Sequence, residues 1–281
     1  MRETIKINTG LEILDKSTVL TIFAKPRAGK TVLMTHLANM AMYDFNRIER
    51  MQLEVEKLNR EGFNLEIPPH CVSANYDITG FQYGFSMQKN RKINPYKLGY
   101  KEGNAFDKDL HLNIPHEVIA ITEAQRYLNS RRSANFPDWQ SRWYESLGHD
   151  GITVMLDTQR PTLIDKNVRE LSIFIEIREL LINKDKYGAI QGLRWKIREI
   201  PSNEALEVYL ASGRNNKECY EEGTITANYN VFECYDTHSC RARFYKGREM
   251  ESFCFTADVE DELPKWFYKS GQNQNKEKQS A

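Results

Sequence analysis

The sequence predicts an α/β fold in which a mostly parallel central sheet is covered by helices, with a smaller β-rich C-terminal portion. A short apolar run rich in β-branched residues, 19–24, precedes a long segment with helical periodicity. Further apolar strand candidates then alternate with helical segments. Strands that alternate with helices predict a parallel sheet that is buried on both faces.

Each element is assigned from its periodicity and from the signals at its ends. Apolar residues at helical spacing from Thr31 to Leu58 predict one long helix, which Gly62 and Pro68-Pro69 end. From Ser172 onward, strand-like runs dominate. The other expected strands cover 70–76, 117–122, 152–157, 173–177, 193–200, 206–211 and 229–235, and the other expected helices cover 124–132 and 139–147.

The composition excludes a global attraction to nucleic acid or to an anionic membrane. Lys plus Arg and Asp plus Glu number 39 each, so any contact with DNA must come from a local basic patch. The N-terminus lacks an apolar signal segment, and no apolar run approaches the ~20 residues of a membrane helix. The five cysteines include no CxxC pair, which disfavours disulfides and zinc. We expect a cytoplasmic protein without a membrane span of its own.

The segment between the first strand and the first helix carries the clearest chemical signal. It reads A-K-P-R-A-G-K-T and fits the Walker A pattern, with Ala24 at the first glycine position. Free N–H groups of the loop and of the helix N-terminus would bind the phosphates of ATP, Lys30 would contact the β- and γ-phosphates, and Thr31 would bind Mg²⁺. An accidental Gly-Lys-Thr at a helix start is the alternative. The expected nucleotide-binding residues are Ala24, Lys25, Pro26, Arg27, Ala28, Gly29, Lys30, Thr31 and Val32.

A second signal is the carboxylate that ends the apolar run 118–122. Glu123 follows this run, as a Walker B element requires, and we expect it to activate the attacking water and to share the metal site with Thr31. The usual preceding Asp is Thr122, whose hydroxyl supplies no negative charge. The alternative is that Glu123 is a surface N-cap for the following helix.

A third polar group follows the strand 152–157. Ligands of parallel α/β sheets bind at the carboxyl ends of the strands, which predicts that Gln159 lies near Glu123 and the loop. Its amide would contact the γ-phosphate or the attacking water. A solvated loop glutamine is the alternative.

Four short segments follow one another in the order of a known motif series: Glu123-Ala124-Gln125-Arg126, Arg131-Arg132, Gly148-His149-Asp150-Gly151 and Thr158-Gln159-Arg160-Pro161. Over about residues 18–180, the chain resembles the zonular occludens toxin-like (Zot domain) family of phage ATPases. That family is similar to filamentous-phage assembly ATPases and to FtsK/HerA-type DNA-pumping motors. The resemblance implies a P-loop NTPase of the additional-strand type that forms a homo-oligomeric ring.

The resemblance also implies an arginine that reaches the site of the adjacent subunit. Arg132 is taken as this catalytic residue, and Arg131 and Arg169 are further candidates; the alternative for each is a solvated surface charge. A basic stretch that contains tryptophans has two interpretations. It contacts DNA phosphates, or its tryptophans pack a helix onto the sheet. It comprises Arg126, Arg131, Arg132, Trp139, Arg142 and Trp143.

The chain departs from the family pattern at three places. Family members usually carry Asp-Glu where this chain has Thr122-Glu123, His-Arg-His where it has Leu147-Gly148-His149, and a Gly-rich loop where it has Arg27-Ala28. These departures bear on hydrolysis and subunit coupling more than on nucleotide binding. Filamentous-phage members also carry a membrane span after the ATPase domain, and its absence here points away from extrusion of virions.

The expected organisation has three parts. Residues 1–185 form a P-loop ATPase core, which an insertion of loops and short elements interrupts at about 77–114. Residues 186–269 form the β-rich extension. Residues 270–281 lack apolar anchors and are expected to be a disordered tail.

The leading hypothesis is a phage or prophage ATPase that hydrolyses ATP to translocate viral DNA, with genome packaging as the favoured process. Its expected partners are further copies of itself in a ring, double-stranded or single-stranded phage DNA, and a capsid or portal protein. The alternative is a virion assembly protein that binds ATP structurally, or a morphogenesis ATPase that acts with a membrane partner in phage export.

Overall fold

The computed structural model describes residues 10–80, 88–99, 111, 113–131, 136–228, 231 and 234. Its strands are β1 (Val19–Phe23), β2 (Val72–Ala74), β3 (Thr79–Gly80), β4 (Gln88–Lys89), β5 (Arg91–Lys92), β6 (Val118–Ile121), β7 (Thr153–Thr158), β8 (Ser172–Lys184), β9 (Ile190–Ile200) and β10 (Glu221–Asn228). Its helices are α1 (Leu11–Leu14), α2 (Lys30–Met42), α3 (Phe45–Arg60), α4 (Asp138–Ser146), α5 (Lys166–Glu170) and α6 (Asn203–Ala211). Short 3-10 turns are η1 (Pro95–Lys97), η2 (Ala124–Arg126), η4 (Pro161–Leu163) and η5 (Lys217–Cys219).

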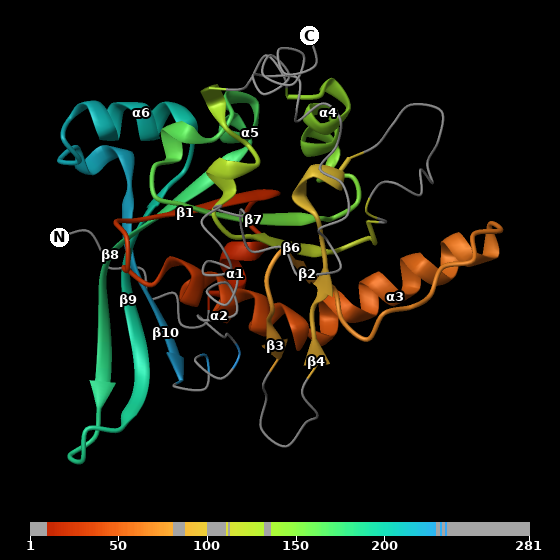
Figure 1. Ribbon diagram of the computed structural model, residues 1–281, viewed down its shortest axis with the longest axis horizontal. Helices are drawn as coiled ribbons and strands as arrows, with labels where there is room; N and C mark the ends of the chain where they lie inside the picture. Colours follow the sequence, from red (N-terminus) through yellow and green to blue (C-terminus); the bar gives the residue numbers. More distant parts are fainter. Residues whose placement is uncertain are drawn as a thin grey trace, which may run out of the picture.

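One mixed sheet organises the described part of the chain, with its strands in the spatial order β10-β9-β8-β1-β7-β6-β2-β5 (Figure 1). Every neighbouring pair from β8 to β5 is parallel, whereas β9 and β10 are added antiparallel at one edge. Strand β7 lies between β1 and β6. The predicted fold class is confirmed.

Helices cover both faces of the sheet. Figure 1 shows α1, α2 and α3 on one side and α4, α5 and α6 on the other. Leu20 and Ile22 of β1 belong to the core on the α2 side, whereas Val19 belongs to the core on the α4 side. Successive residues of a strand point to opposite faces, so both sides of β1 are buried and its whole sequence is apolar or small.

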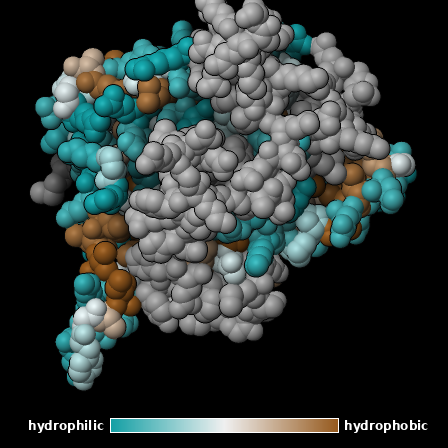
Figure 2. Space-filling view, viewed as in Figure 1, coloured by the Kyte–Doolittle hydropathy of each residue, from teal (hydrophilic) through white to brown (hydrophobic). Residues whose placement is uncertain are grey.

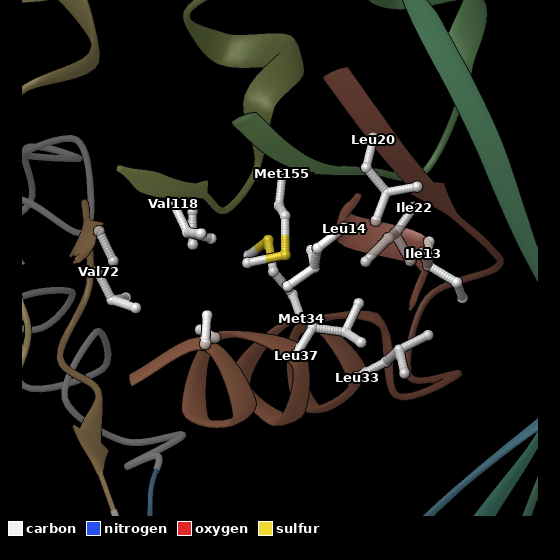
Figure 3. Packing of buried hydrophobic residues seen from close by; sticks show 14 of the residues in the cluster. Ile13, Leu14, Leu20, Ile22, Leu33, Met34, Leu37, Val72, Val118 and Met155 are labelled. Carbon is white, nitrogen blue, oxygen red and sulfur yellow. The ribbon is translucent and has the colours of Figure 1, made fainter. Parts of the chain in front are cut away.

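Helix α2 is anchored to the sheet by a row of apolar side chains. Figure 3 shows Leu33, Met34 and Leu37 pointing from α2 toward Met155 of β7 and Ile22 of β1. All of these side chains are buried, and burial of one such side chain contributes roughly 1.5–3 kcal/mol. This packing fixes the start of α2, and hence the loop before it, against the carboxyl end of β1.

Two of the expected elements were wrong, each because a polar cap outweighs apolar periodicity. The single helix expected from Thr31 to Leu58 is two helices, since the Asp44 side chain accepts the N–H groups of Asn46 and Arg47 and starts α3. The strand expected at 206–211 is helix α6. Ser202 caps it by accepting the N–H of Ala205.

The helix expected at 124–132 is shorter than predicted. Only the 3-10 turn η2 forms there, followed by a tight turn and an isolated bridge between Asn129 and Ile164. Residues 132–135 lie outside the described residues.

The C-terminal strands extend the central sheet. The proposed boundary at residue 185 lies in the turn between β8 and β9, and β10 pairs along β9. Strand β8 pairs with β1 only over 172–176 and then continues with β9 as a hairpin that projects from the body (Figures 1 and 2). The tail 270–281, and nearly all of the strand expected at 229–235, lie outside the described residues.

The described part of 77–114 holds only short elements. They are β3, β4, β5 and η1, of which β5 joins the edge of the main sheet beside β2. Among the helices that the structure describes, none is long and apolar enough to cross a membrane.

Candidate active site

The loop between β1 and α2 has the backbone of a tight, strained turn. The N–H of Ala28 donates to the carbonyl of Lys25 at 3.4 Å, which closes a turn with Pro26 at its second position. Proline suits that position because its φ is fixed. Arg27, at the third position, has φ 62°, a conformation that usually requires Gly or Asn.

The start of α2 presents free N–H donors to this loop. Its N-cap is Gly29, with φ 81° and no side chain to cap the first turn. The first N–H groups of the helix therefore keep their hydrogen-bonding capacity and a partial positive charge. Lys30 is buried beside them, and its ammonium contacts the Lys25 carbonyl at a long 3.4 Å. The loop has the donors and the cation that a polyphosphate requires.

Gly29 is also the point where the projecting hairpin meets the loop. A Cβ on Gly29 would lie 2.8 Å from Leu180 Cδ2 and 3.3 Å from Trp195 Nε1. Trp195 is fully buried, and its indole N–H has no hydrogen-bond partner within the described residues. Both the positive φ and the close approach of β8 and β9 require glycine at this position.

Asp157, at the end of β7, lies at the centre of the polar groups and was missed in the sequence analysis. Its Oδ2 accepts hydrogen bonds from the hydroxyls of Thr31 at 2.7 Å and of Thr122 at 3.1 Å. Its Oδ1 accepts the backbone N–H of Glu123 at 2.8 Å. One buried carboxylate therefore links the loop helix to the end of β6.

The register of the sheet explains this meeting. Asp157 pairs with Ile22 of β1, and Leu156 pairs with Ile121 of β6. Thr122, one residue after Ile121, is therefore level with Asp157. Asp157 could have been recognised from the sequence, because it is a carboxylate at the end of the apolar run that precedes Gln159.

The electrostatics of Asp157 are unfavourable for an isolated charge. Burial raises the pKa of Asp157, and the nearby Glu123 carboxylate raises it further. The hydrogen bonds from Glu123 N–H and the Thr31 hydroxyl, and the charge of Lys30, act in the opposite direction without reversing the shift of the pKa. The charged form of Asp157 is therefore less favourable here than that of an exposed aspartate.

Glu123 lies at the carboxyl end of β6 in a strained conformation. It has φ 53°, which places a non-glycine residue in the left-handed region at a cost of about 1–3 kcal/mol. Its carboxylate is half-exposed and accepts the Gln125 side-chain amide at 2.5 Å, with the Arg126 guanidinium at 3.8 Å. Glu123 is the N-cap residue of the 3-10 turn η2, as the alternative interpretation expected of the following helix, but its side chain makes no capping hydrogen bond. Its role toward the attacking water stays a prediction.

Gln159 lies on the same edge of the sheet and is exposed. The Thr158 hydroxyl donates to the Arg160 carbonyl and accepts the Arg160 N–H, which closes a small turn around Gln159. Gln159 is thus exposed in this turn, two residues after Asp157. Its role as a γ-phosphate sensor stays a prediction.

The arginine candidates differ in their surroundings. Arg132 lies outside the described residues, and Arg131 is exposed. Arg169 is held within the chain: it donates to the Ile164 carbonyl and to Asn203 Oδ1, and it lies 3.5 Å from Glu207. A role for Arg169 in a neighbouring subunit would require these contacts to break.

The tryptophans of the basic stretch pack the α4 side of the fold. Trp143 is fully buried and meets Tyr144 edge-on at 4.9 Å between ring centroids. Trp139 is half-buried, and a Cβ on Gly99 would lie 2.1 Å from its ring. Trp143 therefore serves packing, and exposed arginines such as Arg142 are what this stretch offers to a phosphate.

The residues fit a nucleoside triphosphate and a magnesium ion. The uncapped N-terminus of α2 and Lys30 suit phosphates. The hydroxyls of Thr31 and Thr122 and the carboxylate of Asp157 form an all-oxygen set, which suits a hard divalent cation.

No family model and no curated protein matches the chain. Among solved structures, the chain is similar to the N-terminal domain of zonular occludens toxin from Neisseria meningitidis, at 18% identity and a TM-score of 0.45, covering 79% of this chain and 100% of that chain. It is also similar to the genome packaging NTPase B204 from Sulfolobus turreted icosahedral virus 2 in complex with ATP-gammaS, at 12% identity and a TM-score of 0.36, covering 68% and 94%. A third is B204, the DNA-packaging ATPase from Sulfolobus Turreted Icosahedral Virus, at 14% identity and a TM-score of 0.27, covering 62% and 80%.

Proposed function

We propose that the chain is a P-loop ATPase that binds ATP with Mg²⁺ and hydrolyses it to translocate phage DNA, with genome packaging as the favoured process. The observation that carries the ATPase assignment is the junction of Thr31, Asp157 and Glu123. These residues come from three separate elements and meet beside the uncapped start of α2. The motif order from Glu123 to Pro161 supports DNA as the translocated substrate.

The roles follow from position. The N–H groups of the loop and of the first turn of α2 bind the phosphates, and the Lys30 ammonium neutralises charge on them. Magnesium, when bound, lowers the charge repulsion at the reacting phosphate. Thr31 supplies a hydroxyl ligand to it. Residues 24–29 form the loop around the phosphates, and Val32 adds a backbone N–H from the first turn of α2.

Glu123 is the residue proposed to accept the proton of the attacking water. Its carboxylate is half-exposed at the edge of the sheet and can leave Gln125 by rotation of its side chain. Gln159, exposed on the same edge, is proposed to contact the γ-phosphate. Arg132 is proposed to act on the site of the next copy in a homo-oligomeric ring in the cytoplasm.

The first test is ATP hydrolysis by the purified chain, with no DNA, with double-stranded DNA and with single-stranded DNA. K30A is expected to lower nucleotide affinity and turnover by roughly 10²-fold or more, because it removes the cation that faces the phosphates. E123Q is expected to retain binding and to lower turnover by roughly 10²- to 10⁴-fold, because it removes the base. K57A and E170Q, at exposed lysine and glutamate positions outside the site, are the matched controls.

The outcomes separate two functions. DNA-stimulated turnover that E123Q abolishes supports the translocating ATPase. ATP binding that depends on Lys30 without turnover under any condition supports a virion assembly protein with structural ATP, which the neutral Thr122 favours. Equal binding by the wild type and K30A contradicts both.

A further inference from the structure

The site lacks an acidic residue at position 122, and a different strand supplies one at the same level of the sheet. We propose that Asp157 is the carboxylate on the metal side of this site, so that the negative charge toward Mg²⁺ comes from β7 and not from β6. This inference rests on the proposed function, since it assigns a residue to the metal that accompanies ATP.

The contacts place Asp157 where that charge is needed. Its Oδ2 is 2.7 Å from the hydroxyl of Thr31, the residue proposed to bind the metal directly. The same oxygen is 3.1 Å from the hydroxyl of Thr122. Thr122, the neutral residue where the family usually has Asp, therefore contacts Asp157, the carboxylate proposed to supply the missing charge.

Strand order makes the substitution possible. Because β7 lies between β1 and β6, a side chain at its carboxyl end reaches the loop helix on one side and the end of β6 on the other. Asp157 is level with Ile22 before the loop and with Thr122 after β6. Because β7 is the direct neighbour of β1 and β6 is one strand further away, the end of β7 can supply a carboxylate to Thr31.

The other carboxylate at this edge has different partners. Glu123 accepts the Gln125 amide at 2.5 Å and lies 3.8 Å from Arg126. In the part of the chain that the structure describes, Asp157 is the carboxylate that hydrogen-bonds Thr31. Glu123 is therefore assigned to the attacking water, and Asp157 is assigned to the metal.

Asp157 also positions Glu123. Its Oδ1 accepts the Glu123 N–H at 2.8 Å, and Glu123 has the strained φ of 53°. Asp157 thus affects both the proposed metal site and the backbone of the proposed base, Glu123. The test must therefore measure metal binding separately from ATP turnover.

The experiment is a Mg²⁺ titration of the affinity for a fluorescent ATP analogue, compared with the affinity in EDTA. D157N keeps the size of the side chain and can still bond both threonine hydroxyls and the Glu123 N–H. We expect it to bind the analogue in EDTA as the wild type does. The Mg²⁺ concentration for the half-maximal effect is expected to rise by roughly 10- to 100-fold.

Further variants test whether the effect on Mg²⁺ binding is specific to Asp157. T122V is a comparison variant within the oxygen set: it removes a hydroxyl but no charge at nearly constant size, and it is expected to shift the Mg²⁺ midpoint far less than D157N. A wild-type Mg²⁺ response in D157N, together with a lost response in T122V or E123Q, would overturn the assignment. D157S, which also removes the charge and leaves a hydroxyl, replaces D157N in the same titration if D157N does not fold.

Failure of the proposed function gives a different result. If the wild type binds the analogue no better than K30A, with or without Mg²⁺, the nucleotide site itself is wrong. If the wild type binds it in a manner that depends on Lys30 and Mg²⁺ but not on Asp157, only the present inference is wrong.

Discussion

Two fully buried carboxylates on neighbouring strands of the sheet have opposite surroundings. Glu117 comes directly before β6, at the amino end of the parallel strands, and Asp157 lies near the carboxyl end of β7. Strands β6 and β7 pair directly, so the two residues belong to the same sheet and lie toward its opposite ends. Comparing them distinguishes a carboxylate that is paired with cationic side chains from one that is bonded by hydroxyls and a backbone N–H.

Glu117 is fully compensated by its neighbours. Its Oε1 accepts Arg91 at 2.9 Å, His111 at 3.1 Å and the Ser73 hydroxyl, and its Oε2 accepts the N–H of Ile114 at 3.2 Å. Burial alone raises the pKa of Glu117, but the charge and hydrogen bond of His111, with Arg91 and Ser73, outweigh burial and hold the pKa below its ordinary value.

Asp157 has donors but no ion-pair partner among the described residues. Two hydroxyls and one backbone N–H bond its oxygens, and burial leaves its pKa raised. A carboxylate that serves only the fold is expected to resemble Glu117, with a cation at hydrogen-bond distance. The difference agrees with the proposed role of Asp157, in which a bound cation supplies the positive charge beside it.

The largest expected effect is the loss of Glu117. E117A removes the carboxylate and leaves Arg91 and His111 without their buried partner, which is expected to cost about 3–5 kcal/mol of unfolding free energy. Urea unfolding measures it. E179A, which breaks the exposed ion pair between Glu179 and Lys196, is the matched control and is expected to cost less than about 1 kcal/mol. Equal losses in the two variants would remove the structural role assigned to Glu117.

Acidification sharpens the same contrast. Because the folded-state pKa of Glu117 is below its unfolded value, its contribution to stability is complete above the ordinary glutamate pKa of about 4.3. That contribution is lost as the pH falls from there through the lower folded pKa. The unfolding free energy of the wild type is therefore expected to fall more steeply with acid than that of E117Q, as urea midpoints between pH 7 and acid would show. Parallel curves would contradict the lowered pKa.

The sequence predicted the parts of this edge that depend on local pattern. The strand, loop and helix from Val19 to Met42 follow from an apolar run, a glycine before Lys30 and helical spacing. The ends of β6 and β7 follow from apolar runs that stop at polar residues. These signals lie within short stretches of chain, so they can be recognised without knowing the order of the strands in the sheet.

The contacts of Asp157 could not be predicted in this way. They depend on β7 lying between β1 and β6, and on a register that makes Ile22, Asp157 and Thr122 level. A shift of one residue would turn Asp157 to the other face of the sheet. The break between α2 and α3 was visible, since Asp44 is a strong N-cap, but the apolar periodicity on both sides of it favoured one helix.

The smallest expected effect is the change in stability of D157N, and it tests the contrast between Glu117 and Asp157 most directly. In EDTA, D157N is expected to change the unfolding free energy by no more than about 1 kcal/mol, because the lost charge-assisted hydrogen bonds offset the removed cost of a buried, unpaired charge. With Mg²⁺ and an ATP analogue, ligand binding should stabilise the wild type more than D157N. Urea unfolding under both conditions measures the two differences. A loss in EDTA as large as that of E117A would make Asp157 a second structural carboxylate, and the contrast between the two ends of the sheet would no longer point to a cation.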